Sequence, residues 1–152
     1  MCRNVDRHNA LIFHHQSQYR HAGRWFSLFQ RLDIFDNGML VAITDISATC
    51  HMPDVIEAPY RPAMLGELLH GPAIRLGGPS CLAGDIIGDY RLPVAAEPGQ
   101  RFAFLDQAHY SMVKTTTFNG VPLPSIWLWN SDTDELRCVR EFGWEEFRDR
   151  LS

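Results

Sequence analysis

A short glycine-rich stretch holds the residues most suited to chemistry. Residues 78–85 read Gly-Pro-Ser-Cys-Leu-Ala-Gly-Asp and set a thiol and a carboxylate four residues apart. The proline and glycines disfavour a helix and let the backbone approach a ligand closely. Cys81 is then either an acid or nucleophile on an exposed loop, or a buried structural thiol, the commoner role of a free cysteine. Asp85 is either a loop-capping carboxylate or an anchor for an amine.

Two other groups of residues have weaker chemical signals. Residues 1–31 hold four of the seven histidines, which suits a metal site, but nothing in this stretch fixes a ligand geometry. An irregular, poorly ordered extension is the favoured interpretation, and no metal is predicted. Cys50 and His51 are a nucleophile and a base in adjacent positions. Adjacent side chains of an extended chain point to opposite faces, which disfavours proton transfer between them.

Composition limits the classes of protein. The chain has 152 residues, 45 % of them apolar, which suits one domain with a real core. A formal net charge of −4 argues against nucleic acid and anionic membranes, and is compatible with a cationic ligand. No apolar run is long enough to span a membrane, and no secretory signal is evident. The four cysteines are scattered, which predicts reduced thiols in the cytoplasm.

The pattern of apolar residues predicts a mostly β chain. Residues 39–46 read as a strand with two largely apolar faces, central in its sheet. Three prolines in residues 47–62 leave room for at most one helical turn, between Pro53 and Ala58. Strands are further predicted at residues 74–76, 101–106, 108–117, 125–129 and 136–142. A bend is predicted at residues 119–120, and short helices within residues 19–32 and 144–151. The fold class is therefore all-β with a short C-terminal helix, as a sandwich or barrel.

Several motifs in one order point to a family. Residues 78–85 are followed by Tyr-Ser-Met-Val-Lys at 110–114, Phe-Asn-Gly at 118–120 and Pro-Ser-Ile at 124–126. Together they resemble the C-terminal β domain of the carboxynorspermidine/carboxyspermidine decarboxylases, which are pyridoxal-phosphate (PLP) enzymes of the alanine-racemase-like group. The resemblance covers residues 32–152, implies a barrel-like domain, and leaves residues 1–31 as an unmatched extension. Leu82 stands where relatives acting on ornithine, arginine or diaminopimelate carry an acidic residue, which favours the carboxynorspermidine branch.

The resemblance implies a role for individual residues. The cysteine matching Cys81 reaches across a homodimer interface and donates a proton to the carbanion left by CO₂. The tyrosine matching Tyr110 donates its hydroxyl to the PLP phosphate. The aspartate matching Asp85 binds the distal amine of a carboxylated polyamine substrate. Phe118 and Asn119 match residues that line the dimer interface near the site.

Two further acids belong to a loop that the resemblance aligns less closely. Asp54 or Glu57 contacts the polyamine tail, and the choice between them stays open.

The resemblance also implies a missing part. The family's N-terminal (β/α)₈ barrel supplies the lysine that forms the Schiff base with PLP, whereas the single lysine of this chain, Lys114, falls in the β domain. The chain is therefore predicted to be a C-terminal fragment that needs a PLP-binding barrel to decarboxylate anything. The alternatives are a non-catalytic remnant or dimerisation module without activity of its own, and a metal-binding module using the histidines and Cys81.

Overall fold

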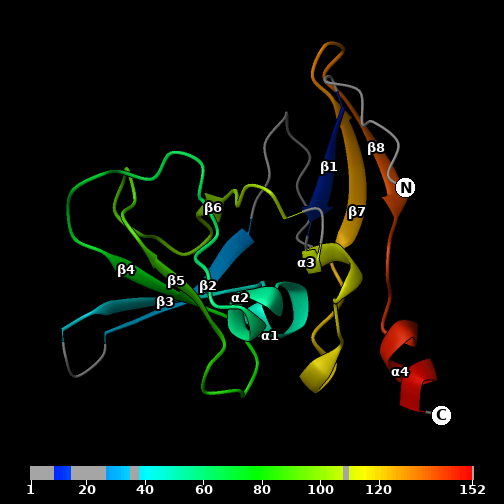
Figure 1. Ribbon diagram of the computed structural model, residues 1–152, viewed down its shortest axis with the longest axis horizontal. Coiled ribbons are helices and arrows are strands. Elements are labelled where there is room, and N and C mark those ends of the chain that lie inside the picture. The colour runs from blue at the N-terminus through cyan, green and yellow to red at the C-terminus, as the bar shows by residue number, and fades with distance from the viewer. Residues whose placement is uncertain (1–8, 15–26, 35–37, 108–109, 152) are drawn as a thin grey trace.

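Two open β-sheets organise the molecule (Figure 1). The computed structural model describes residues 9–14, 27–34, 38–107 and 110–151. The larger sheet has the strand order β5 (Ile86–Tyr90), β4 (Ile74–Gly77), β3 (Leu40–Thr44), β2 (Ser27–Ile34) and β6 (Arg101–Phe102). The smaller sheet has the order β1 (Asn9–His14), β7 (Ser125–Asn130) and β8 (Glu135–Arg140). The mostly β composition is confirmed, whereas a closed barrel is not, because the described strands form two separate sheets.

Strand β3 lies in the middle of the larger sheet, as its two apolar faces predict. It pairs antiparallel with β2 and parallel with β4. A parallel pair needs a crossover connection, and here the crossover carries two single-turn helices, α1 (Ala48–His51) and α2 (Asp54–Glu57). The single turn expected between Pro53 and Ala58 is thereby confirmed. The helices bring the crossover back over the end of β3.

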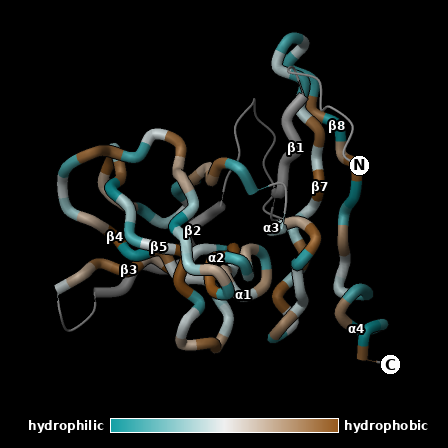
Figure 2. The backbone as a smooth tube through the Cα atoms, viewed as in Figure 1, coloured by the Kyte–Doolittle hydropathy of each residue, from teal (hydrophilic) through white to brown (hydrophobic). Residues whose placement is uncertain are grey.

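The hydrophobic core lies where this sheet meets the crossover (Figure 2). Ala42, Leu76 and Tyr90 from the strands pack in one cluster with Met52 and Val55 from the crossover. The hydroxyl of Tyr90 donates a 2.9 Å hydrogen bond to the Pro62 carbonyl, which satisfies the buried polar end of that side chain. The core therefore fixes the position of α1 and α2 relative to the sheet.

Two strands predicted from local propensity differ in the structure. Residues 108–117 were expected to form a strand, but they contain helix α3 (Tyr110–Val113), closed by a 2.9 Å bond from Lys114 N–H to the Tyr110 carbonyl. After the helix, Thr116 N–H donates to the Cys50 carbonyl at 2.8 Å. This contact with α1 overrides the β propensity of the threonines. The strand expected at residues 101–106 shortens to β6, with one further bridge between Met64 and Phe104.

The N-terminal part is more regular than expected where it is described. Ser27–Ile34 form β2 rather than part of a helix, because they pair with β3 and β6. The expected boundary at residue 32 therefore falls inside a strand. Asn9–His14 form β1, which pairs antiparallel with β7. His8, His15 and His21 of the proposed metal site lie outside the described residues.

The C-terminal part follows the sequence prediction closely. The two strands expected at residues 125–129 and 136–142 are β7 and β8, which pair as a hairpin, and helix α4 (Glu145–Leu151) follows. The expected bend is a 3₁₀ turn, η1 (Phe118–Gly120). Every residue of β8 is exposed. Among the described residues, no helix combines the length and apolar character needed to cross a membrane.

Candidate functional site

The carboxylate of Asp85 anchors the loop that carries Cys81. Its Oδ1 and Oδ2 accept bonds of 3.0 and 2.9 Å from the Ser47 hydroxyl, and backbone N–H groups of Thr49 and Ser80 donate at 3.1 and 3.0 Å. Asp85 is 5 % exposed. A Cβ on Gly78 would collide with this carboxylate, so only glycine fits beside it. The contacts support the loop-capping interpretation of Asp85 over the amine-anchor interpretation.

Ser47 links this carboxylate to helix α1. Its Oγ accepts a 3.0 Å bond from Cys50 N–H, which is the N-cap bond of the helix, while the hydroxyl hydrogen is directed to Asp85. Sequence reasoning missed this role. A serine directly before the first residue of a helix is a typical N-cap signal, and Ser47 would have indicated that α1 starts at Ala48.

Cys81 is exposed and is paired with Asn119, 38 residues further along the chain. Asn119 Oδ1 accepts from the Cys81 backbone N–H at 3.4 Å and from its thiol at 3.3 Å. Asn119 has a left-handed backbone, with φ of 59°, which asparagine tolerates better than most residues. The structure thus supports the exposed-loop interpretation of Cys81 and brings it next to two other predicted residues, Phe118 and Asn119.

Cys50 and His51 do not form a dyad. The Cys50 thiol is buried and donates to the Phe118 carbonyl at 3.4 Å, and burial raises the pKa of this thiol. The His51 ring accepts from Ser47 N–H through Nδ1 at 3.1 Å, and its Nε2 donates to the Pro122 carbonyl at 2.9 Å. Both side chains therefore tie α1 to its surroundings. The sequence argument disfavoured a dyad by assuming an extended chain, whereas the two residues lie in a helix.

The structure separates the two acids of the crossover. The carboxylate of Asp54 accepts from the Tyr60 hydroxyl at 2.8 Å and from the Ser111 hydroxyl at 3.3 Å. Glu57 instead forms an ion pair with Lys114 at the surface. The Lys114 ammonium also lies 5.5 Å from the ring centre of Tyr110, a cation–π distance. Of the two acids, Glu57 is the one whose carboxylate is paired with a cation.

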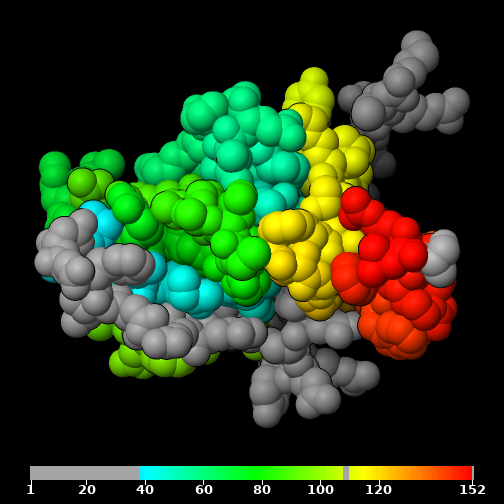
Figure 3. All heavy atoms as spheres, turned by 90° about the horizontal axis from the view of Figure 1, so that it is seen from below, coloured from blue at the N-terminus to red at the C-terminus, as the bar shows by residue number. Residues whose placement is uncertain are grey.

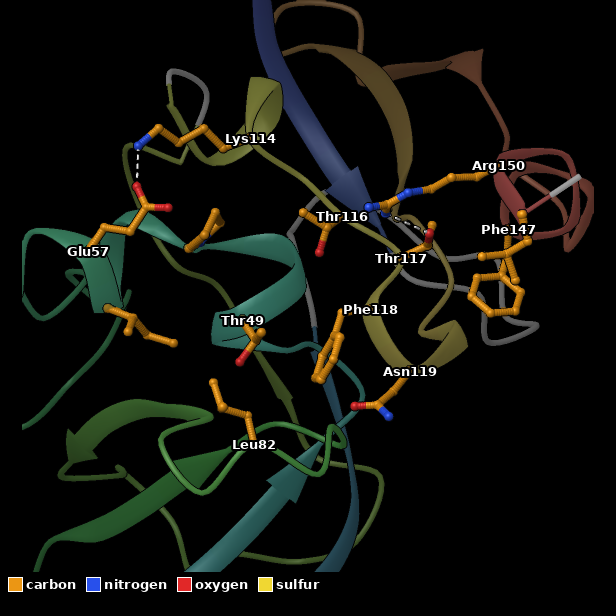
Figure 4. A pocket seen from close by; sticks show the side chains of 13 residues that line it. Thr49, Glu57, Leu82, Lys114, Thr116, Thr117, Phe118, Asn119, Phe147 and Arg150 are labelled. Atoms are coloured by element: carbon orange, nitrogen blue, oxygen red, sulfur yellow. Dashed lines mark hydrogen bonds and ion pairs between the residues drawn. The ribbon is translucent and has the colours of Figure 1, made fainter.

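A cavity of about 570 Å³ lies beside Cys81's loop and extends to Glu57. Figure 4 shows the Glu57–Lys114 pair on one side of it and Arg150 and Phe147 of α4 on the other. In the space-filling view of Figure 3, segment 110–120 lies between the rest of the domain and the C-terminal residues. The lining residues come from the crossover, Cys81's loop, segment 114–119 and α4: Thr49, Pro53, Ile56, Glu57, Leu82, Lys114, Thr116, Thr117, Phe118, Asn119, Phe147, Arg150 and Leu151.

The cavity has the volume and the mixed lining of a small-molecule site. Sites of this kind are apolar with a few placed polar groups, and here Ile56, Leu82 and Phe118 line the cavity together with the charged Glu57, Lys114 and Arg150. Tyr110, 66 % exposed, lies next to Lys114 at the cavity's edge. Across the described ranges, no group of three or more histidine, cysteine, aspartate or glutamate side chains is placed to bind a metal ion.

The fold is similar to that of solved decarboxylase structures. It resembles the crystal structure of lysine/ornithine decarboxylase complexed with cadaverine from Vibrio vulnificus, with a TM-score of 0.55 over 64 % of this chain and 27 % of that one. At 16 % sequence identity, that likeness shows a shared fold. No protein-family model matches the sequence.

More similar relatives are decarboxylases of carboxylated polyamines. The chain is 48 % identical over 113 residues to carboxyaminopropylagmatine decarboxylase of Synechocystis sp., covering 72 % of this chain and 29 % of the relative. It is 36 % identical over 130 residues to carboxynorspermidine/carboxyspermidine decarboxylase of Campylobacter jejuni, covering 76 % and 34 %. The crystal structure of the carboxynorspermidine decarboxylase from Campylobacter jejuni, complexed with norspermidine, matches with a TM-score of 0.73 and 34 % identity, over 82 % of this chain and 37 % of that chain.

These findings confirm the resemblance to the C-terminal β domain of the carboxynorspermidine/carboxyspermidine decarboxylases. The chain spans about a third of the length of the relatives that it matches.

Proposed function

We propose that this chain is the β-domain part of a PLP-dependent decarboxylase of a carboxylated polyamine. The observation that carries the proposal is the position of Cys81. An exposed thiol sits on a loop fixed by a buried carboxylate, beside a cavity whose wall carries Glu57. Similarity to polyamine decarboxylases supports this assignment of the cavity.

Cys81 and Glu57 have separate tasks in this proposal. The Cys81 thiol donates its proton to the substrate carbon that has lost CO₂, and the resulting thiolate regains a proton from solvent because the residue is exposed. Glu57 holds a substrate ammonium, which takes the place of Lys114 at the carboxylate. Asp85 positions Cys81's loop rather than contacting substrate, because its buried oxygens already accept from three donors, the Ser47 hydroxyl and the backbone N–H groups of Thr49 and Ser80.

Among the described residues, Tyr110 suits one edge of PLP, the phosphate. The exposed Tyr110 offers a hydroxyl to the phosphate. Bound PLP supplies the electron sink for loss of CO₂ through a lysine Schiff base. The single lysine of this chain, Lys114, lies directly after α3 in the β domain, so we assign the Schiff-base lysine to a barrel domain. Phe118 and Asn119, adjacent to Cys81, would then face a homodimer partner, and the chain alone would not decarboxylate.

A complementation assay tests the proposal. The chain is mixed with the barrel domain of the Campylobacter jejuni relative and PLP, and CO₂ release is followed with carboxynorspermidine, carboxyspermidine and carboxyaminopropylagmatine as substrates. We expect activity only on mixing, and its loss in Cys81→Ala. Cys138→Ala is the matched control, because Cys138 is also an exposed free thiol. Binding of the barrel without activity would support a dimerisation module instead, and equal losses in both variants would contradict the role of Cys81.

The panel of substrates also separates the members of the class. The 48 % identity to the Synechocystis relative favours carboxyaminopropylagmatine over the two carboxylated triamines. A higher kcat/KM for either triamine would overturn that preference and leave the class assignment unchanged.

A further inference from the structure

We propose that Asn119 is a positioning residue that directs the thiol hydrogen of Cys81. The catalytic meaning of this inference rests on the proposed function, whereas the contact between Cys81 and Asn119 does not depend on that function. The two residues are 38 positions apart in sequence and meet through one oxygen atom, Asn119 Oδ1.

The orientation of the Asn119 amide follows from hydrogen-bond chemistry. The two ends of an asparagine amide are distinguished by their partners. The backbone N–H of Cys81 can only donate, and it points at the amide of Asn119 at 3.4 Å. The oxygen must therefore face Cys81, since an NH₂ group there would oppose another donor. The thiol, 3.3 Å from the same oxygen, then has an acceptor and no donor opposite it.

The backbone on both sides of this contact is fixed. Asn119 sits in the left-handed region inside η1, between bonds from Gly120 N–H to the Thr117 carbonyl at 2.9 Å and from Val121 N–H to the Phe118 carbonyl at 3.2 Å. The Phe118 carbonyl also accepts the buried Cys50 thiol at 3.4 Å, which ties η1 to α1.

Cys81's loop is held from the other side. Ser80 N–H donates to the Asp85 carboxylate at 3.0 Å, and Asp85 N–H donates to the Leu82 carbonyl at 3.0 Å. Asp85 in turn connects the loop to α1, because its carboxylate accepts hydrogen bonds from the Ser47 hydroxyl and from Thr49 N–H at the start of that helix. The distance between thiol and amide is thus set by one short helix that both segments contact.

This arrangement directs the thiol hydrogen at one acceptor oxygen while the site is empty. An acceptor oxygen binds S–H and offers no hydrogen to a thiolate. Rotation about the Cβ–Sγ bond turns the hydrogen away from Asn119 when another acceptor is offered. The role differs from a contact across a subunit interface, because it operates within one chain.

Alkylation of Cys81 tests the role without requiring decarboxylation. Iodoacetamide reacts with the thiolate, and labelling of the 152-residue chain is read at the Cys81 peptide by mass spectrometry. Asn119→Gly removes the acceptor and keeps the left-handed backbone at no steric cost, so labelling should accelerate about two- to tenfold, the range of one net hydrogen bond. Asn119→Asp keeps the acceptor and adds negative charge, so labelling should slow by about threefold or more.

The labelling rate is expected to rise in Asn119→Gly and to fall in Asn119→Asp, and these opposite changes distinguish positioning of the thiol from a general loosening of the loop. Asp134→Gly is the matched control, a left-handed residue in the β7–β8 hairpin with φ of 54°, and it should leave the Cys81 rate unchanged. Acceleration of similar size in both Asn119 variants would mean that Asn119 only holds the loop together, and an unchanged rate in both would mean that it does not act on the thiol. Either result overturns the inference, while the complementation assay judges the proposed function separately.

Discussion

The Ser47 hydroxyl lies 3.0 Å from Oδ1 and 2.9 Å from Oδ2 of Asp85, across 38 residues of sequence. The same oxygen caps helix α1 by accepting from Cys50 N–H at 3.0 Å. One buried side chain therefore joins the start of a helix to the loop of the exposed thiol. The position of Cys81 therefore depends on the hydrogen bond between Ser47 and Asp85.

Asp85→Asn should destabilise the protein. The substitution replaces one acceptor oxygen with a donor, which then opposes a backbone N–H of Thr49 or Ser80. An unpaired buried donor costs about 1–3 kcal/mol, and we expect the free energy of unfolding in urea to fall by that amount. Asp89→Asn is the control, because its carboxylate is paired with Arg75 at a partly exposed site and such pairs contribute below about 1 kcal/mol. Equal effects in the two variants would contradict the anchoring role.

His51 should be required for stability through both ring nitrogens. His51→Ala removes the acceptor for Ser47 N–H and the donor to the Pro122 carbonyl, so we expect a loss of about 2 kcal/mol or more. His51→Gln can place an amide N–H near the position of Nε2 and retain the second bond. Its loss of stability should be about half as large, as measured by urea unfolding at neutral pH. A glutamine variant as unstable as the alanine variant would show that the Pro122 bond contributes little.

Tyr90 should make the protein sensitive to alkaline pH. Burial raises the pKa of its hydroxyl above the ordinary value of 10.0. A group whose pKa is raised on folding contributes full stability below its unfolded pKa and loses it as pH rises through the folded one. The free energy of unfolding should therefore fall above about pH 10.

Tyr90→Phe provides the comparison. The variant loses the bond to the Pro62 carbonyl, worth about 1 kcal/mol at neutral pH, but its stability should decline less steeply between pH 9 and 11, a window around the ordinary tyrosine pKa of about 10. Parallel curves for the two proteins, measured by urea titration at each pH, would exclude Tyr90 as the titrating group.

Glu57→Gln should weaken substrate binding in the complemented enzyme. Loss of the carboxylate removes the charge-assisted contact with a substrate ammonium, so KM for the carboxylated polyamine should rise about tenfold with a smaller change in kcat. Asp54→Asn is the control, since its carboxylate already accepts from Tyr60 and Ser111. A larger rise in KM for the Asp54 variant would reverse the assignment of the two acids. This prediction depends on the proposed function.

The sequence predicted elements whose apolar pattern is strong and local. Strands β3, β7 and β8 and helix α4 all fall within residue ranges where the apolar pattern predicted a strand or a helix. Helix α3 was missed because the contact from Thr116 to Cys50, a tertiary hydrogen bond, outweighs local β propensity.

The site was predictable in its residue types but not in its connections. The motif around Cys81 indicated a thiol on an exposed loop, and the structure agrees. The burial of Asp85 depends on Ser47 and Thr49, which no local pattern relates to it. The Cys81–Asn119 pair likewise arises only when α1 brings two distant segments together.

The turn that presents Asn119 is followed by Gly120, and this dipeptide carries a chemical instability. An asparagine before glycine loses its side-chain amide by spontaneous cyclisation through the glycine nitrogen and hydrolysis, which leaves aspartate or isoaspartate. The 2.9 Å bond from Gly120 N–H to the Thr117 carbonyl restrains that nitrogen and slows the reaction in the folded state. Deamidation during long storage would therefore place a carboxylate against the Cys81 thiol. The reactivity of that thiol would then change with the age of the protein preparation.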